Sequence, residues 1–209
     1  MLSSHRGRGF AYVALIGAVL SVGVAAAADT TEEAPIVAIW QIQRVDFVYN
    51  SNSVRYSCGN LQRRIAAILQ AVGAHANMGV ELGCNSGELV RYANVHLTLA
   101  IPVEATEENV RAATNFGTRD ELVARLHQSQ LPTANDIARF PANWRTVALS
   151  RSPPLSLGPG DCDLLRALRD DVFPQLRIRV VSSGLRCGGG SDTRIPPKIH
   201  VNALIPSRT

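Results

Sequence analysis

One stretch of this 209-residue chain occurs twice, and this repetition most constrains how the chain can fold. Each copy begins at a tryptophan, contains two cysteines and ends in an apolar segment closed by a proline. The two sets of marker residues are Trp40, Cys58, Cys84 and Pro102, and Trp144, Cys162, Cys187 and Pro206. The first cysteine follows the tryptophan by 18 residues in both copies, and the two cysteines are 26 and 25 residues apart. The sequence therefore predicts two tandem repeats, residues 29–102 and 144–209, joined by residues 103–143.

The first copy changes from a strand pattern to a helix pattern and back. Apolar residues alternate with polar ones over 45–49 and again over 54–58, on either side of the turn-rich tetrapeptide 50–53. This pattern predicts a β-hairpin, with a single long kinked strand as the alternative. A helical face follows, formed by Leu61, Ile65, Ile68, Leu69 and Val72. Ser57 is placed to begin this helix and Gly73 to end it, and strands are expected near 78–84 and 94–101.

The second copy keeps the helix but not the hairpin. Three prolines, Pro153, Pro154 and Pro159, fall where the hairpin would recur, and proline lacks the N–H group that a strand ladder needs. We expect a loop there, then a helix capped by Asp161 and stopped by Pro174. The fold class is predicted to be α+β, with two tandem (β)βαββ repeats whose antiparallel sheet is covered by helices. Whether the repeats share one sheet or form two domains is left open by the pattern.

The four cysteines are predicted to form one disulfide in each repeat. A helix of about 14 residues rises about 21 Å, and a returning strand of about seven residues covers nearly the same length. The end of the strand is thus brought back beside the start of the helix. Of the three possible connectivities, only Cys58–Cys84 with Cys162–Cys187 respects the repeat. A zinc site built from all four thiols is the alternative, although the C-x2-C spacing that structural zinc prefers is missing.

The connecting segment, residues 103–143, has a different character from the repeats. Thr118 precedes Asp120 and Glu121 in the form of a capping box, and Thr106 stands before two glutamates in a similar way. These signals predict one or two short helices that cross between the repeats. A recognition or lid element is the alternative.

Residues 1–28 have the features of a secretory signal peptide. A short basic region is followed by an uncharged run over 10–24 and by Ala26-Ala27-Ala28, which a signal peptidase accepts. An uncleaved membrane anchor is the competing interpretation. Removing this segment removes two of the 21 basic residues and none of the 17 acidic ones, so the mature chain is almost neutral. A nucleic-acid partner is therefore not expected.

The order of these motifs resembles a group of uncharacterised exported proteins of Gram-negative bacteria. The resemblance is carried by Trp40, Tyr-Ser-Cys58, a helix and Cys84, followed by Trp144, Gly-Pro-Gly-Asp-Cys162, a helix and Cys187. It covers most of the mature chain and implies export and a two-copy layout, with no activity attached. Together with the signal peptide and the cysteines, it leads us to expect a periplasmic or secreted protein.

Two histidines occupy the same position in both copies and are the candidate ligand or metal site. His96 and His200 each lie six residues before the closing proline, on the face of a strand opposite to the apolar residues. If the copies pack about a two-fold axis, the two imidazoles can converge on a metal or a small ligand. The alternative is that both are polar residues on an exposed sheet face.

The remaining polar candidates have simpler structural explanations. Asp161 and Asp163 flank Cys162 and suggest a carboxylate pair, but capping accounts for Asp161 without chemistry. Trp40 and Trp144 are interpreted as core anchors at strand starts, with ligand stacking as the alternative. No serine-hydrolase elbow or phosphate-binding glycine motif occurs, so no catalytic residue and no cofactor is expected.

The leading functional hypothesis is a non-catalytic exported protein that binds a protein or an envelope component. The alternative is a small-molecule or metal binder that uses His96 and His200, and the third possibility is an enzyme of an unrecognised type. Contact with a membrane is expected only through an uncleaved signal segment.

Overall fold

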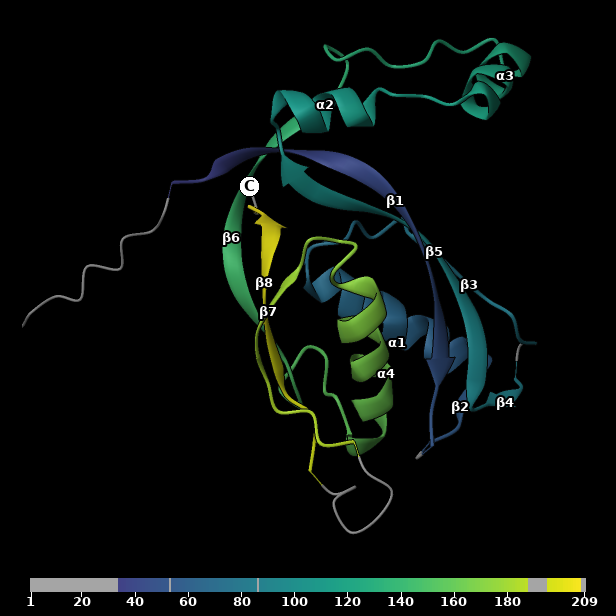
Figure 1. Cartoon of the computed structure of the whole chain (residues 1–209), viewed down its shortest axis with the longest axis vertical. Coiled ribbons are helices and arrows are strands. Elements are labelled where there is room, and N and C mark those ends of the chain that lie inside the picture. The colour runs from purple at the N-terminus through teal and green to yellow at the C-terminus, as the bar shows by residue number, and fades with distance from the viewer. Residues whose placement is uncertain (1–33, 53, 86, 188–194, 208–209) are drawn as a thin grey trace, which may run out of the picture. The chain divides into compact units, whose positions relative to one another are not determined.

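A computed structural model describes residues 34–52, 54–85, 87–187 and 195–207 of the chain (Figure 1). These residues all belong to one compact unit, Glu33–Thr209. The predicted signal peptide, residues 1–28, lies outside the described residues.

The fold is α+β, as the sequence predicts. Six antiparallel strands form the main sheet in the order β3-β5-β1-β6-β8-β7, and β2 pairs with β4 in a separate ribbon. The strands are β1 (Ile36–Asn50), β2 (Tyr56–Ser57), β3 (Gly79–Leu82), β4 (Leu89–Val90), β5 (Tyr92–Glu104), β6 (Arg139–Leu149), β7 (Arg179–Ser183) and β8 (Ile199–Pro206). The helices are α1 (Cys58–Ala71), α2 (Glu107–Ala113), α3 (Thr118–Leu126), the 3₁₀ turn η1 (Pro159–Asp161), α4 (Cys162–Ala167) and the π-helical turn η2 (Leu168–Val172).

The strand order places corresponding elements of the two halves at corresponding positions. β1 and β6 are central, β5 and β8 flank them, and β3 and β7 form the two edges. A single sheet therefore crosses both halves, which answers the question that the sequence left open. A shared order of elements does not by itself establish two copies of one unit, so the tandem repeat stays a prediction.

The two central strands overlap only at their beginnings. β1 pairs with β6 through four residue pairs, from Ile36 with Ala142 to Ile39 with Arg139. Because the strands are antiparallel, β1 then continues in one direction and β6 in the other. We call β3, β5 and β1 the first arm, and β6, β8 and β7 the second arm. Figure 1 shows the arms diverging from the overlap, with α1 and α4 between them.

A single hydrophobic core fills the space between the arms. The predicted face of α1 is buried, and α4 with η2 contributes a second apolar row. The core residues of these helices are Leu61, Ile65, Ile68, Leu69, Leu164, Leu165, Leu168 and Val172. Alternate residues of the strands complete it, such as Val45, Phe47 and Tyr49 of β1. The two helices thus bury their apolar faces against both arms at once.

The hairpin predicted for residues 45–58 is wrong. β1 is one continuous strand to Asn50, and it pairs along its length with β5. The following residues leave the main sheet, because the Ser51 backbone N–H donates to the Arg91 carbonyl oxygen at 2.8 Å and the Ser51 hydroxyl donates to Asp163. Tyr56–Ser57 then pairs with β4 instead of β1.

The start and the end predicted for the first helix are confirmed. α1 is preceded by Ser57, although the Ser57 side chain makes no capping hydrogen bond. Gly73 follows the helix with a φ of +98°, a conformation that glycine adopts without strain. A Cβ atom at this position would lie 2.6 Å from the carbonyl oxygen of Leu204 in β8. The end of α1 therefore approaches the backbone of the second arm too closely for any side chain.

Both short helices predicted in the connecting segment are present. The Thr106 hydroxyl caps α2 by accepting from the Asn109 N–H at 3.2 Å. α3 begins one residue earlier than predicted, since Gly117 is its N-cap and the Asp120 carboxylate accepts from the Gly117 N–H at 3.1 Å. The ends of the segment are strand instead of helix, because β5 extends to Glu104 and β6 begins at Arg139.

Both predicted disulfides are present. Cys58 bonds to Cys84 and Cys162 to Cys187, so each bridge joins the first residue of a helix to the chain beyond the next edge strand. Two disulfides point to an oxidising compartment outside the cytoplasm. Among the described residues, no helix has the length and apolar character needed to cross a membrane.

Candidate functional site

The two histidines of the predicted ligand site lie in different arms. His96 is on β5 opposite Asp46 of β1, and His200 is on β8 opposite Ala148 of β6. Asp46 and Ala148 lie on opposite sides of the short overlap between β1 and β6. The structure therefore does not bring the imidazoles together as a two-fold arrangement was expected to do.

Each histidine has a local partner on an exposed sheet face. His96 Nδ1 lies 2.8 Å from Asp46 Oδ1, and His200 Nδ1 lies 2.8 Å from the Ser182 hydroxyl oxygen. Within the described part of the chain, no group of three or more His, Cys, Asp or Glu side chains is arranged to hold a metal ion. Ligand binding by these two histidines stays a prediction.

The main pocket lies where the arms meet. Its volume is about 610 Å³, within the range typical of small-molecule sites. Its lining comes from the end of β5 and from α2 on one side, and from β6, β7 and β8 on the other. The apolar base is formed by Ile101 of the first arm, Leu204 of the second arm, and Leu176 and Ile178 of the turn that precedes β7.

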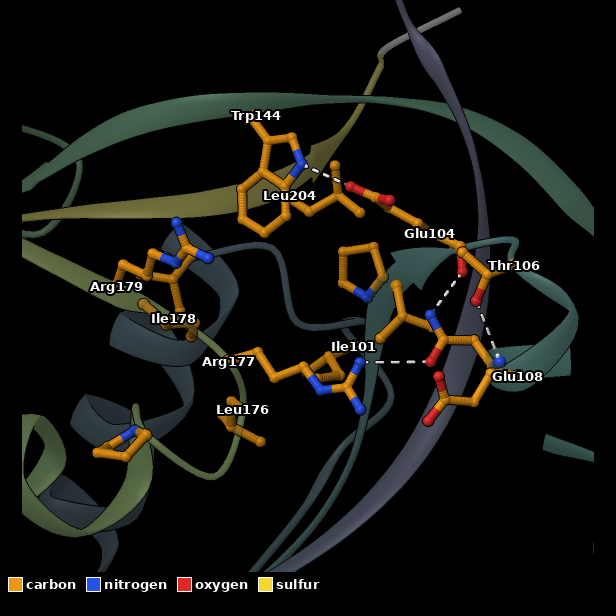
Figure 2. A pocket seen from close by; sticks show the side chains of 15 residues that line it. Ile101, Glu104, Thr106, Glu108, Trp144, Leu176, Arg177, Ile178, Arg179 and Leu204 are labelled. Atoms are coloured by element: carbon orange, nitrogen blue, oxygen red, sulfur yellow. Dashed lines mark hydrogen bonds between the residues drawn. The ribbon is translucent and has the colours of Figure 1, made fainter. Parts of the chain in front are cut away.

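Polar side chains of opposite charge line two sides of this pocket (Figure 2). Glu104 and Glu108 come from the end of β5 and from α2. Arg177 and Arg179 come from the approach to β7 and from its first residue. Figure 2 shows the Arg177 side chain extending across the pocket toward α2. The pocket thus combines an apolar base with fixed charges, as binding sites for small organic molecules do.

Trp144 is a wall of this pocket and not a core anchor. Its side chain is 39% exposed, and its indole N–H donates to Glu104 Oε1 at 3.0 Å. This hydrogen bond links the second arm to the first and fixes the orientation of the indole ring. Trp40, in contrast, packs against Phe140 and His75 and does not itself line the pocket. The prediction that both tryptophans are core anchors is therefore wrong for Trp144.

A buried asparagine positions the arginine that crosses the pocket. Asn109 is 7% exposed, and its side-chain NH₂ donates to the Glu104 carbonyl oxygen at 2.8 Å. Arg177 Nη1 donates to Asn109 Oδ1 at 3.3 Å. Both polar ends of the buried amide are thus used, which fixes its orientation.

The backbone of Arg177 adopts an unusual conformation. Its φ is +56°, in the left-handed region that long side chains rarely occupy and that costs about 1 kcal/mol or more. The two backbone bonds around it, Arg177 N–H to Pro174 O and Ile178 N–H to Phe173 O, help hold the turn in place. Such conformations gather at functional sites, because they aim a side chain that a regular element would direct elsewhere.

Asp161 stands at the N-cap position of α4, but its side chain does not cap the helix, contrary to the prediction from the sequence. It is 3% exposed, and Oδ1 lies 3.0 Å from Arg64 Nε of α1 and accepts from the Tyr56 hydroxyl. Its second oxygen accepts from the Gly158 N–H at 2.7 Å. Asp161 therefore joins the start of α4 to α1 and β2.

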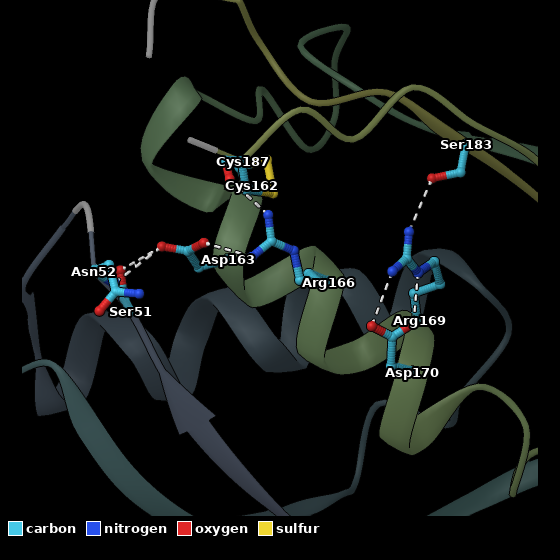
Figure 3. The surroundings of a disulfide bond; sticks show 9 residues. All are labelled: Ser51, Asn52, Cys162, Asp163, Arg166, Arg169, Asp170, Ser183 and Cys187. Carbon is cyan, nitrogen blue, oxygen red and sulfur yellow. Dashed lines mark hydrogen bonds and ion pairs between the residues drawn. A yellow bond between two sulfur atoms is a disulfide. The ribbon is translucent and has the colours of Figure 1, made fainter. Parts of the chain in front are cut away.

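Asp163, the other member of the suggested carboxylate pair, has separate partners (Figure 3). Its Oδ2 accepts from the Ser51 hydroxyl at 2.9 Å, and its Oδ1 lies 3.6 Å from Arg166. Arg166 also donates to the Cys187 carbonyl oxygen at 2.7 Å, which ties the disulfide to the same group. The Asp161 carboxylate pairs with Arg64 and the Asp163 carboxylate with Arg166. The two aspartates therefore hold parts of the fold together and do not form an acid–base pair.

Burial also raises the pKa of two tyrosines, Tyr49 and Tyr56, near Asp161 and Asp163. The pKa of Tyr56 is raised well above its ordinary value, first by burial and then by the hydrogen bond to Asp161. Burial likewise raises the pKa of Tyr49, whose ring lies 6.0 Å from that of Tyr56. Both phenols therefore stay neutral over the physiological pH range.

No protein-family model, no curated protein and no solved structure matches this chain. Its function must therefore be inferred from its own residues.

The pocket residues escape sequence reasoning because no local pattern marks them. Arg177 lies two residues before β7, in a turn that no repeating pattern marks. Glu104 and Asn109 lie in the segment interpreted as a connection. Trp144 is the one residue for which the sequence offers a hint of the pocket, because ligand stacking is the alternative interpretation of the two tryptophans.

Proposed function

We propose that the protein is an exported, non-catalytic binding protein that holds a small organic ligand in the pocket between its arms. This proposal narrows the partner expected from the sequence from a protein or envelope component to a small molecule. The predicted signal peptide and the two disulfides support a periplasmic or secreted location.

One observation carries the proposal. Arg177 is held in a left-handed conformation by its surroundings, and the buried amide of Asn109 directs its guanidinium across an apolar pocket. The left-handed φ is shared by Gln128 and Ser156, so it is the contact with the buried Asn109 and the open pocket that set Arg177 apart. Fixed polar groups above an apolar base give orientation and specificity to a bound molecule.

Binding is favoured over catalysis by the chemistry of the lining. The described side chains around the pocket include one hydroxyl, that of Thr106, which accepts a hydrogen bond as the cap of α2. A nucleophile needs a general base within hydrogen-bond reach, and among the described residues no hydrogen bond joins the Thr106 hydroxyl to Glu104 or Glu108. This set of residues can recognise a ligand without a reacting group of its own.

Nuclear magnetic resonance of the two indole N–H groups tests the proposal. Trp144 lines the pocket and Trp40 does not, so Trp40 serves as an internal control within the same protein. The probes are small apolar fragments that carry no charge, one negative charge, one positive charge or both charges. We expect at least one class to shift the Trp144 signal in a saturable way while the Trp40 signal stays in place. Trp144→Phe assigns the two signals.

Equal shifts of both indole signals, or no shift with any probe, would contradict a binding role for the pocket. A variant that fills the pocket gives a second check. Leu204→Trp places a larger side chain in the base, and it should abolish the probe-dependent shift if the signal reports on occupancy. Far-ultraviolet circular dichroism of this variant verifies that the fold is retained.

A further inference from the structure

We infer that the ligand of this pocket is a zwitterion with an apolar body, such as an apolar amino acid or a short apolar peptide with free ends. The inference rests on the proposed binding function and adds the chemical class of the ligand. It follows from the number, the placement and the availability of the charges that line the pocket.

The four charged side chains of the pocket do not neutralise one another through ion pairs. Within the described part of the chain, neither Arg177 nor Arg179 lies within ion-pair distance of Glu104 or Glu108. The arginines belong to the β7 side and the glutamates to the side of β5 and α2. Figure 2 shows Arg179 and Glu104 on opposite sides of the pocket. The pocket is therefore neutral in sum. Arg179 lies across from Glu104, whereas the Arg177 guanidinium reaches the α2 side, where it donates to Asn109 Oδ1 beside Glu108 (Figure 2).

Arg177 and Glu104 both have hydrogen-bonding groups left for a ligand. Arg177 gives one N–H to Asn109, and a guanidinium has five N–H groups. Its planar fork matches a carboxylate better than an ammonium group of lysine would. Glu104 uses Oε1 for the Trp144 indole, and its second oxygen can accept from an ammonium group. The carboxylate and the ammonium group of one molecule thus find partners close to each other, at the side of the pocket formed by the end of β5 and α2.

A ligand with only one charge fits this arrangement less well. An anion would be attracted by Arg177 and Arg179 but repelled by the two nearby carboxylates. A cation would be attracted by the carboxylates but repelled by the two arginines. Like charges at close range discriminate against wrong ligands as effectively as attraction selects the right one. The apolar base and the indole of Trp144 provide contact for the hydrophobic side chain, which projects away from the charged groups.

Calorimetric titration with matched ligands tests the inference on the wild-type protein. The zwitterions are leucine, phenylalanine, leucyl-leucine and phenylalanyl-leucine. Each is compared with its N-acetyl form, which is an anion, and with its C-terminal amide, which is a cation. We expect N-acetylation and C-terminal amidation each to raise the dissociation constant of the preferred zwitterion at least tenfold at pH 7.

Two variants then test which side chain binds the ammonium group of the ligand and which binds its carboxylate. In Glu104→Gln, which keeps an acceptor for the Trp144 indole, the penalty for N-acetylation should fall to less than threefold, because the partner of the ammonium group is already neutral. In Arg177→Gln, the penalty for amidation should fall in the same way. Glu107→Gln on α2 and Arg145→Gln on β6 change the same charges next to the pocket without lining it, so both should behave like the wild type.

Capped and free forms that bind equally well would overturn the inference. So would an anion or a cation that binds best, or no binding of any zwitterion up to its solubility limit. These outcomes are distinct from failure of the binding function. If neutral or singly charged fragments still shift the Trp144 indole signal, the pocket binds ligands but not zwitterions. If no probe shifts it, both proposals fail.

Discussion

The carboxylate of Asp161 accepts hydrogen bonds from residues far apart in the sequence while it is 3% exposed. Arg64 of α1, Tyr56 of β2 and the Gly158 N–H surround it. Burial of a carboxylate is costly unless it is paired and hydrogen-bonded, so these partners allow the charge to stay inside the fold. A single residue thus connects β2, α1 and the start of α4.

Removal of Arg64 should expose the cost of this buried charge. We expect Arg64→Ala to lower the free energy of unfolding by about 2 kcal/mol, since Asp161 would lose its compensating cation while Arg64 itself is partly solvated. Urea unfolding at pH 7 under non-reducing conditions measures the change. Arg63→Ala is the matched control, because Arg63 is the exposed neighbour on the same helix and should change stability by at most about 0.5 kcal/mol. Equal effects of both changes would contradict the role of Arg64.

The raised pKa of Tyr56 predicts a loss of stability at high pH. In the unfolded chain the phenol ionises near its ordinary pKa of about 10, whereas in the folded protein it holds its proton to higher pH. The stability it contributes is complete below pH 10 and is lost as pH rises toward the folded pKa. Between pH 10 and 11.5, the free energy of unfolding should fall by up to about 1.4 kcal/mol per pH unit for this group. Urea titrations of Tyr56→Phe should show a shallower fall, and an unchanged slope would disprove the assignment.

At the scale of elements, the end of α1 is the point where a helix of one half approaches a strand of the other. Gly73 has both a left-handed backbone and no room for a Cβ atom beside the Leu204 carbonyl oxygen. Position 73 therefore couples the helix end to the backbone of β8. The requirement for glycine is set by two independent constraints.

Alanine at this position should be strongly destabilising. We expect Gly73→Ala to lower the free energy of unfolding by about 2 to 3 kcal/mol, because the backbone must adopt a strained φ and β8 must move. In the same helix, Gly59→Ala meets its nearest atom at 3.6 Å and should stabilise the protein by up to about 1 kcal/mol through helix propensity. Thermal and urea unfolding of both variants check the opposite signs. Similar stability of Gly73→Ala and Gly59→Ala would contradict the close approach of Gly73 to the Leu204 carbonyl oxygen.

The disulfides should stabilise their elements by similar amounts. The bridged cysteines are separated by 26 and 25 residues, so the chain-entropy model gives about 3.5 kcal/mol for each bridge. We expect the paired change Cys162→Ser with Cys187→Ser to cost about 3 kcal/mol, and the paired change at Cys58 and Cys84 to cost nearly the same. Urea unfolding measures both, and mass mapping of the oxidised protein checks the pairing. A bridge between the halves would contradict the structure.

The elements themselves could be predicted where a repeating pattern or a chemical constraint acts over short range. The apolar face of α1, the stop at Gly73 and the cap at Thr106 follow from local rules, and the disulfides follow from helix and strand lengths. The hairpin failed because the choice between β5 and β2 as the partner of β1 depends on residues about 40 positions away. The pocket failed for the same reason, since Arg177 and Asn109 meet only in the folded chain.

At the scale of the whole described unit, one core and one sheet include both halves. The overlap of β1 and β6 is short, but α1 and α4 share a single apolar cluster with both arms. Neither arm can therefore lose its packing without exposing apolar surface of the other. The unit is expected to be a single cooperative structure.

Chemical denaturation should show one transition for the mature chain. In Trp40→Phe, the fluorescence of Trp144 reports on the junction of the arms, and far-ultraviolet circular dichroism reports on all elements. We expect the two signals to give the same urea midpoint within error. Two separated transitions would show that the halves fold as independent domains and would contradict the shared core.

The placement of the pocket gives its occupant a thermodynamic role. Because its walls belong to both arms, a molecule that binds there must bind the folded chain and not the unfolded one. Such a molecule raises the melting temperature, and at a hundredfold excess over its dissociation constant it adds about 2.7 kcal/mol to stability. A thermal-shift screen of metabolite collections can therefore find the natural ligand through the rise in melting temperature alone.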